Sequence, residues 1–394
     1  MTVRTVPPIA EAQELGLDPH RLARIREAVS RDVAGLRYDG MAIRVLKDGQ
    51  PVLAEDIGYA ERASDRALTP DTVFLTMSLG KQFVNAVVLS YVERGLLDLT
   101  LPVAEVLPGF GCRGKDRITL FHLLTHTGGV FSGVPPLPPG ELASNAAVAA
   151  FAAGARLESL PGERVNYSMV CAHAVLGEML RAADGGRRTF TELMSGELFD
   201  LLGMTETSVG VREDLASRLA PMAARYTEAG VFGPADVEGV GALIGIPGSE
   251  MAAGGYVTTA SDLTRFVLML RNGGEFGGFR LLSPAMIKLA AQNHTGRLRN
   301  TLFDFTLDGR HWSEFPAHIG LGFFVRGSGV APGPFGNLCS PDTFGGAGAG
   351  TSCFWVDPQH DTAFIMLTTG AMEDTRHYER SRRISDMVIS SITG

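Results

Sequence analysis

Lysine and cysteine are scarce in this chain of 394 residues. The basic residues are almost all arginine, and the lysines are Lys47, Lys81, Lys115 and Lys288. Any motif that contains a lysine is therefore more informative than usual. No CxxC pair and no Cys/His ligand pattern occurs among the widely spaced Cys112, Cys171, Cys339 and Cys353. We expect reduced, mostly buried thiols rather than a disulfide framework or a zinc site.

The sequence also lacks an apolar run of membrane-spanning length, and its first residues lack the apolar core of a secretory signal. We therefore expect a cytoplasmic protein without a membrane partner. The net charge of -8 argues against nucleic-acid binding as the main task. A content of 45% hydrophobic and 20% charged residues is typical of a soluble globular protein, so a small-molecule substrate is favoured.

Strand-like segments lie near both ends of the chain, and mainly helical segments lie between them. Short strands are predicted near both ends, at residues 41–46, 52–58, 320–326, 353–356 and 362–368. Helices are predicted at residues 18–33, 78–94, 171–180, 260–272, 284–293 and 379–392. This order predicts an α+β sandwich, in which an antiparallel sheet from both termini is flanked by helices. Residues 1–95 and 255–394 would form this domain, and residues 96–254 would form an inserted, mainly helical domain. The active site would lie at the interface of the two domains.

The strongest local motif is Thr-Met-Ser-Leu-Gly-Lys, which places Ser78 and Lys81 three residues apart. On a helix this spacing puts both side chains on one face, about one turn apart. A serine hydroxyl is a poor nucleophile at neutral pH and needs a base within hydrogen-bond reach. Lysine serves as that base only if burial or nearby cations lower its pKa. The alternative is that Ser78 merely starts a helix and Lys81 is a solvated surface charge. In a chain with so few lysines, the number of Ser-x-x-Lys matches expected by chance is roughly 0.2, so the motif alone is suggestive.

Two further segments carry possible chemistry. Tyr167 lies in Val-Asn-Tyr-Ser-Met just before a predicted helix, and a tyrosine hydroxyl that ionises near a cation can relay a proton. The alternative is an ordinary core tyrosine. Residues 344–352 are rich in glycine, which lets a substrate approach backbone N–H groups that can hold an oxyanion. This segment lacks the lysine of a Walker loop and the third glycine of a dinucleotide fingerprint, so both nucleotide interpretations fail.

Together with residues 118–129, 253–263 and 354–358, these segments resemble the serine β-lactamase-like superfamily. The resemblance covers residues 18–390. The superfamily includes class C β-lactamases, DD-peptidases and family VIII carboxylesterases, and the chain resembles the family VIII carboxylesterases most. It implies that Ser78 is acylated, Lys81 is its general base and Tyr167 relays a proton. It also implies that the backbone N–H groups of Ser78 and Ala349 form the oxyanion hole and that substrate contacts Met169, Gly346, Ala347 and Gly348.

Two departures from the family pattern bear on the substrate. Met169 stands where an asparagine that helps to hold a β-lactam side chain is usual. Gly346 stands where the family has lysine, histidine or tryptophan, so a group that grips a substrate carboxylate is missing. Both changes favour a carboxylesterase or transacylase for small to medium acyl esters over a β-lactamase or DD-peptidase-like amidase.

Several alternatives remain beside this hypothesis. The chain could be a catalytically silent binding protein with the same fold, although an intact Ser78, Lys81 and Tyr167 argue against it. His122 and His126 have the spacing of a helical metal pair but lack the glutamate of His-Glu-x-x-His, so a capped helix end is favoured. No Gly-x-Ser-x-Gly motif of an α/β-hydrolase occurs. We expect no metal and no cofactor. A homo-oligomer is possible, and the sequence does not identify the natural substrate or the acyl acceptor, which is water, an alcohol or an amine.

Overall fold

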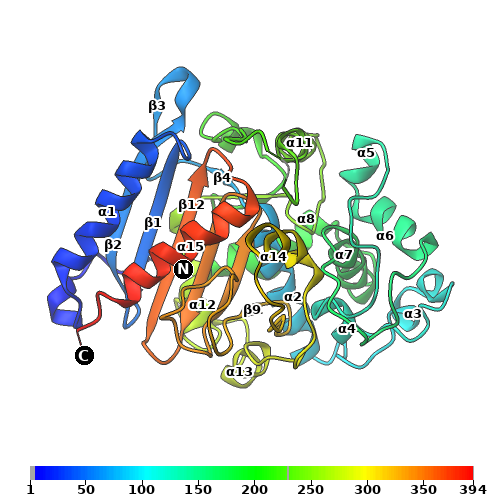
Figure 1. Ribbon diagram of the computed structural model, residues 1–394. Helices are drawn as coiled ribbons and strands as arrows, with labels where there is room; N and C mark the ends of the chain where they lie inside the picture. The colour runs from blue at the N-terminus through cyan, green and yellow to red at the C-terminus, as the bar shows by residue number, and fades with distance from the viewer. Residues whose placement is uncertain (1–4, 229, 394) are drawn as a thin grey trace.

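A seven-stranded sheet lies at the centre of the computed structural model, which describes residues 5–228 and 230–393. The strand order is β3-β2-β1-β12-β11-β10-β9, and the described neighbours pair antiparallel (Figure 1). Strand β1, from the N-terminal part, pairs with β12, from the C-terminal part. The predicted α+β fold with an antiparallel sheet is therefore confirmed. The strands are β1 (Gly40–Lys47), β2 (Gln50–Glu61), β3 (Arg66–Ala67), β9 (Phe324–Val325), β10 (Phe344–Gly348), β11 (Ser352–Asp357) and β12 (Thr362–Thr369).

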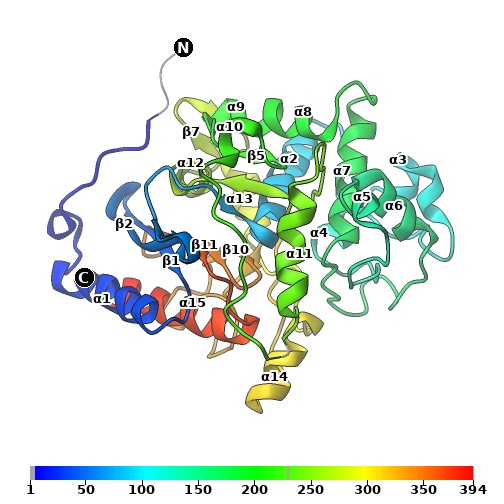
Figure 2. The same cartoon turned by 90° about the horizontal axis from the view of Figure 1, so that it is seen from above.

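Helices cover both faces of this sheet. The N-terminal helix α1 (Pro19–Ala34) and the C-terminal helix α15 (Asp374–Ile389) pack side by side on one face, and α12 (Ala260–Arg271) packs on the other (Figure 2). Successive residues of a strand point to opposite faces. Phe364 thus enters the core beneath α1 and α15, while Ile365 enters the core around α12. Because both faces of β11 and β12 are buried, these two strands read as nearly continuous apolar runs.

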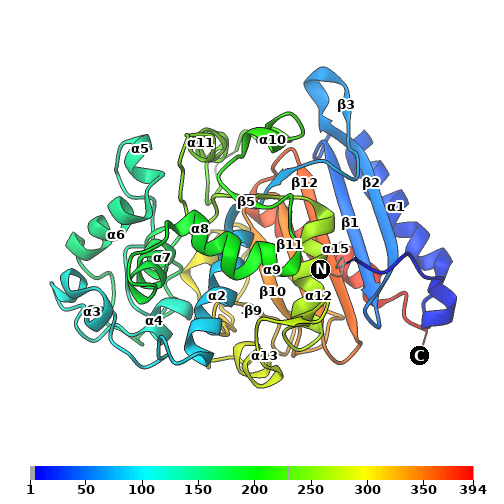
Figure 3. The same cartoon turned by 180° about the vertical axis from the view of Figure 1, so that it is seen from behind.

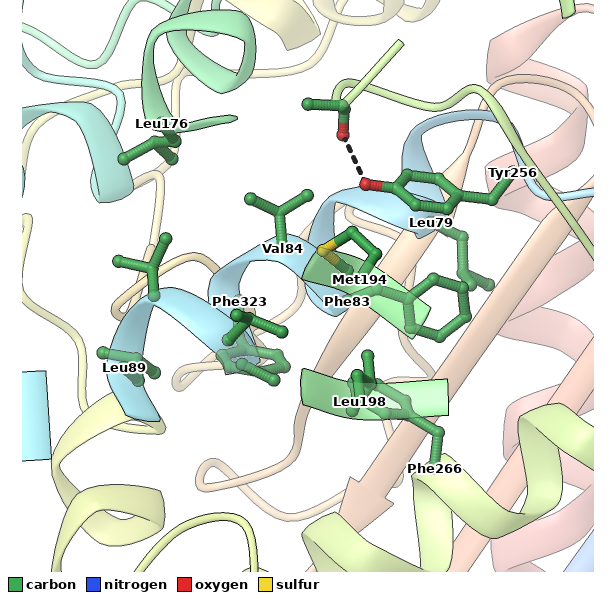
Figure 4. Packing of buried hydrophobic residues seen from close by; sticks show 14 of the residues in the cluster. Leu79, Phe83, Val84, Leu89, Leu176, Met194, Leu198, Tyr256, Phe266 and Phe323 are labelled. Atoms are coloured by element: carbon green, nitrogen blue, oxygen red, sulfur yellow. Dashed lines mark hydrogen bonds between the residues drawn. The ribbon is translucent and has the colours of Figure 1, made fainter. Parts of the chain in front are cut away.

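Helix α2 (Lys81–Glu93) passes through the largest core and continues directly from the short 3-10 helix at Met77–Gly80. Every residue from Lys81 to Tyr91 is buried, and most of them are apolar, as expected for a helix surrounded by other elements. The ring of Phe83 makes edge-to-face contacts, with centroid distances of 4.9 to 5.6 Å, to Phe199, Tyr256 and Phe266. Figure 4 shows Phe83 with Tyr256 and Phe266 in this core. Such pairs each contribute about 0.5–1.5 kcal/mol beyond simple burial. The segment that carries Ser78 and Lys81 is therefore anchored in a rigid core.

Apart from the short strand β5 (Ser208–Val209), the described residues of 96–254 form helices and irregular loops, and helices α3 to α7 (residues 103–183) lie to one side of the large sheet (Figure 3). Residues 96–254 join the rest of the chain through a small sheet in which β6 (Tyr256–Thr258) lies between β4 (Phe74–Leu75) and β5. The division into two domains stays a prediction. The helices are α3 (Val103–Val106), α4 (Leu120–Leu124), α5 (Pro139–Leu142), α6 (Asn145–Gly154), α7 (Cys171–Ala183), α8 (Phe190–Met194), α9 (Asp200–Leu202), α10 (Glu213–Ala216) and α11 (Pro234–Ile244).

The remaining strands and α-helices are the hairpin of β7 (Glu275–Phe276) and β8 (Phe279–Arg280), α13 (Pro284–Ala290) and α14 (Asp304–Arg310). In the described part of the chain, no helix combines the length and the apolar character needed to span a bilayer. The described cysteines are free thiols, and all but Cys112 are buried, as predicted.

Helix α1 begins where the sequence predicts, because Asp18 accepts hydrogen bonds from the backbone N–H groups of its first turn. Several other predicted boundaries are wrong by three residues or more, and two of them bear on the pocket. The last helix begins at Asp374 rather than at residue 379, since the Glu373 carboxylate caps it. The strand predicted over residues 320–326 is limited to β9, because Gly322 adopts φ +83° and turns the chain before it.

Candidate active site

Ser78 and Lys81 face each other at the start of α2. Lys81 Nζ lies 3.0 Å from Ser78 Oγ, and it donates hydrogen bonds to the backbone oxygens of Met169 (2.8 Å) and Ala253 (2.7 Å). The lysine is 1% exposed, and no described acidic side chain forms a salt bridge with it. Burial without a counter-charge lowers the pKa of Lys81 from 10.5 to about 7. Near neutral pH, a substantial fraction of this amine is therefore uncharged.

The backbone that presents Ser78 is strained. Met77, directly before it, adopts φ +52°, a left-handed conformation that costs a side-chain-bearing residue about 1–3 kcal/mol. Gly254 packs against this residue so closely that a Cβ on Gly254 would lie 2.8 Å from the Met77 carbonyl oxygen. The surrounding packing thus holds a tight turn at which the serine is aimed out of the core.

Tyr167 lies over this pair. Its ring centroid is 5.3 Å from Lys81 Nζ, and its hydroxyl is hydrogen-bonded to Ser78. Burial raises the pKa of Tyr167 to about 12, so the phenol keeps its proton near neutral pH. The expectation that a nearby cation eases its ionisation is wrong for this site, because burial dominates and the neighbouring lysine is itself readily deprotonated. A neutral hydroxyl can still relay a proton, since it both donates and accepts.

His126 supports Tyr167 from the other side. The two rings stack with centroids 4.3 Å apart, and His126 Nδ1 accepts a hydrogen bond from the backbone N–H of Ser168. Burial, with the Lys81 charge second, lowers the pKa of His126 to about 3, so the ring is neutral. His122 Nδ1 instead contacts Thr119 at the start of α4. The two histidines therefore have different partners: His126 packs on Tyr167, and His122 bonds at the start of α4. No metal-ligating cluster occurs among the described residues.

The glycine-rich segment forms strand β10, which packs against the turn that carries Ser78. A Cβ on Gly348 would lie 2.4 Å from the Thr76 carbonyl oxygen, so only glycine allows this approach. Ser352 on the next strand donates a 2.7 Å hydrogen bond to the same oxygen. As a result, Ser78 and Ala349 line one pocket, in which both backbone N–H groups could serve one oxyanion.

The position of Gly346 is filled from α2. A Cβ on Gly346 would lie 2.3 Å from Gln82 Oε1, and the Gln82 Nε2 donates to the Gly322 backbone oxygen at 3.0 Å. The space beside Gly346, where the resemblance implies a lysine, histidine or tryptophan in other members of the family, is thus occupied by the glutamine next to Lys81. Sequence reasoning identified the missing side chain but not the residue that replaces it.

The pocket in front of Ser78 is small and mostly apolar. Its lining joins predicted residues to others that sequence reasoning missed, because they come from four separate segments. The predicted ones are Ser78, Tyr167, Met169, Ala347 and Ala349. The additional ones are Val231, Phe232, Leu302, Phe324, Asp374 and Tyr378. No lysine or arginine lines this pocket in the described part of the chain.

Comparisons with known proteins agree with these observations. A family model described as Beta-lactamase matches residues 25–387. The chain is 27% identical over 381 residues to the "Esterase/beta-lactamase LipL" of Mycobacterium tuberculosis (strain ATCC 25618 / H37Rv). The alignment covers 91% of this chain and 84% of that protein.

Solved structures show the same fold. A penicillin-binding protein homologue from Caulobacter crescentus superposes with a TM-score of 0.75 at 23% identity, covering 94% of this chain and 99% of that chain. A family VIII carboxylesterase superposes with a TM-score of 0.74 at 18% identity, covering 94% and 97% of the two chains. The resemblance that the motifs carry is thereby confirmed: the chain belongs to the beta-lactamase family of serine hydrolases.

Proposed function

We propose that this chain is a carboxylesterase or transacylase that forms an acyl-enzyme at Ser78. The observation that carries the proposal is the 3.0 Å separation between the serine hydroxyl and a buried lysine amine that lacks a counter-charge. Such an amine is a base matched to neutral pH, and the serine is the acceptor of the acyl group.

The hydrogen bonds of Lys81 support its role as the base. A neutral amine has two N–H donors and one lone pair. The backbone oxygens of Met169 and Ala253 take up two donors, at 2.8 and 2.7 Å. The lone pair is then left for the third neighbour, the hydroxyl of Ser78. In the uncharged state, therefore, Ser78 donates to Lys81, which is the direction of proton transfer that activates the serine.

The remaining steps use groups that line the same pocket. Ser78 Oγ attacks the ester carbonyl while its proton passes to Lys81, and the N–H groups of Ser78 and Ala349 stabilise the oxyanion. Tyr167 passes a proton to the leaving alcohol as the tetrahedral intermediate collapses to the acyl-enzyme, and it regains a proton from protonated Lys81, so both groups return to their starting states. Water, or another alcohol or amine, then takes the acyl group from Ser78 by the reverse sequence. Substrate would enter between residues of the sheet and of the mainly helical region, in line with the proposed two-domain division.

Two observations favour esters over β-lactams and peptides. The pocket wall at Met169 is apolar, and Gln82 occupies the space in which a cationic side chain at Gly346 would meet a substrate carboxylate. The Mycobacterium tuberculosis relative is named as both an esterase and a beta-lactamase, so β-lactam hydrolysis is the second candidate.

A substrate panel tests the proposal. We expect the wild type to hydrolyse short p-nitrophenyl esters far faster than a chromogenic cephalosporin, and Ser78→Ala to abolish ester turnover. Intact mass spectrometry during turnover should show one acyl adduct on the wild type and none on the variant. Rapid cephalosporin hydrolysis without ester turnover would favour the second candidate, and unchanged ester turnover by Ser78→Ala would contradict both.

A further inference from the structure

Asp374 is an acidic side chain in the wall of the active-site pocket. It lies in the first turn of α15 and lines the pocket together with Ser78, Ala349 and Tyr378, one turn further along the helix. The backbone N–H groups of Gly350 and Phe232 are directed at its carboxyl group. Because Gly350 directly follows Ala349, this carboxyl group lies beside the proposed oxyanion hole.

Capping of the helix does not explain this residue. The carboxylate of the preceding residue, Glu373, already accepts hydrogen bonds from the backbone N–H groups of Thr375 (2.9 Å) and Arg376 (3.2 Å). Asp374 is 5% exposed, and no described lysine or arginine forms a salt bridge with it. Burial, with the Glu373 charge second, raises the pKa of Asp374 to about 7. An acid that is buried without a cation destabilises the fold, so a role toward a ligand is the better account.

The charge of the pocket depends on this one group. Of the described lining residues, Asp374 is the only acidic one, and no lysine or arginine among them offsets it. In a low-dielectric pocket a carboxylate repels an anionic substituent and attracts a cationic one at separations of several ångströms. The position of Gly346 offers no compensating cation, because Gln82 fills it.

We propose that Asp374 determines substrate specificity: it excludes esters that carry a carboxylate near the scissile bond and favours neutral or cationic ones. This inference rests on the proposed esterase function and names its substrate class. It adds an active repulsion to the two departures already seen in the sequence, at Met169 and Gly346, which merely remove attractive contacts.

Matched esters test the proposal at about pH 8, where most of the Asp374 carboxyl is ionised given its pKa of about 7. The first series is phenyl acetate, meta-carboxyphenyl acetate and meta-(trimethylammonio)phenyl acetate, which vary the charge of the leaving group. The second is p-nitrophenyl hexanoate with its ω-carboxylate and ω-trimethylammonium analogues, which vary the acyl side. We expect the wild type to prefer the cationic over the anionic ester by at least tenfold in kcat/KM in at least one series.

The Asp374→Asn variant, which keeps the shape and removes the charge, should reduce that preference, taken as the ratio of kcat/KM for the cationic and the anionic ester, by at least tenfold. The control is Glu379→Gln, which removes one negative charge from the same helix outside the pocket and should leave the preference intact. A wild type without charge preference in either series would overturn the proposal, whether or not the Asn variant folds. An unchanged preference in a folded Asp374→Asn variant would overturn it as well. If the wild type cleaves none of the neutral esters, the esterase function fails, and the assignment of Asp374 fails with it.

Discussion

Because the pKa of Lys81 is lowered in the folded chain, the free energy of unfolding should depend on pH, and this prediction can be tested without any substrate. In the folded chain this amine gives up its proton near pH 7, whereas in the unfolded chain it does so near 10.5. Between these values the unfolded state binds more protons, so the free energy of unfolding rises with pH in this window. The full difference of about 3.5 pH units corresponds to about 5 kcal/mol, which is the stability that the buried amine withholds below pH 7.

The substitution Lys81→Met removes this contribution, because methionine fills a similar space without a titratable group. It leaves the backbone oxygens of Met169 and Ala253 without their donor, a cost of about 1–3 kcal/mol each that does not vary with pH. The difference in unfolding free energy, wild type minus variant, should therefore increase by about 2 kcal/mol between about pH 7 and about pH 9.

Urea-induced unfolding of both proteins at these two pH values measures the difference, and the other titrating groups cancel because both chains share them. The control is Lys288→Met, which removes a lysine whose charge lies at the exposed side of α13 and should show no such pH dependence. If the wild type and Lys81→Met changed in parallel, within about 0.5 kcal/mol, the amine would have an ordinary pKa and the argument for a neutral base would be refuted.

Two further predictions concern neighbours of the Ser78–Lys81 pair. Tyr167→Phe should slow hydrolysis of an alkyl ester by about 10²–10⁴-fold but affect a p-nitrophenyl ester much less, since p-nitrophenolate leaves without a proton. Steady-state kinetics on both esters measures the two losses, and equal losses would contradict the proton relay by Tyr167. Gly346→Lys should lower stability by about 1–3 kcal/mol because its Cβ meets the Gln82 amide, and Gln82→Ala in the same chain should restore most of that loss. Thermal unfolding of the single and double variants measures the coupling, and additive losses would show that the two sites do not touch.

The parts of the site that sequence reasoning predicted are local in the chain. Ser78 and Lys81 are one helical turn apart, so their spacing alone predicts that they meet. The sheet was predictable for a similar reason, because apolar runs such as residues 362–368 read clearly when both faces of a strand are buried. Asp18 likewise marks the start of α1, since its cap lies within three residues of its partners.

The remaining parts depend on contacts between distant segments. Asp374 enters the pocket because α15 begins five residues earlier than the helical pattern indicates, through the cap at Glu373. His126 reads as the end of a helix, and only the tertiary fold stacks it on Tyr167. The environment of Gly346 is set by Gln82, a residue more than 260 positions away in the chain. Burial also reverses the expected ionisation of Tyr167, and spacing carries no information about burial.

The pH dependence of Ser78 acylation tests the central claim most directly. Intact mass spectrometry can follow the rate at which a fluorophosphonate probe adds to the protein across the neutral pH range. We predict a single adduct on Ser78, formed at a rate that rises through about pH 7 as Lys81 loses its proton, and none on Ser78→Ala. An adduct that forms equally fast on Ser78→Ala, or a rate that does not change with pH, would contradict the account.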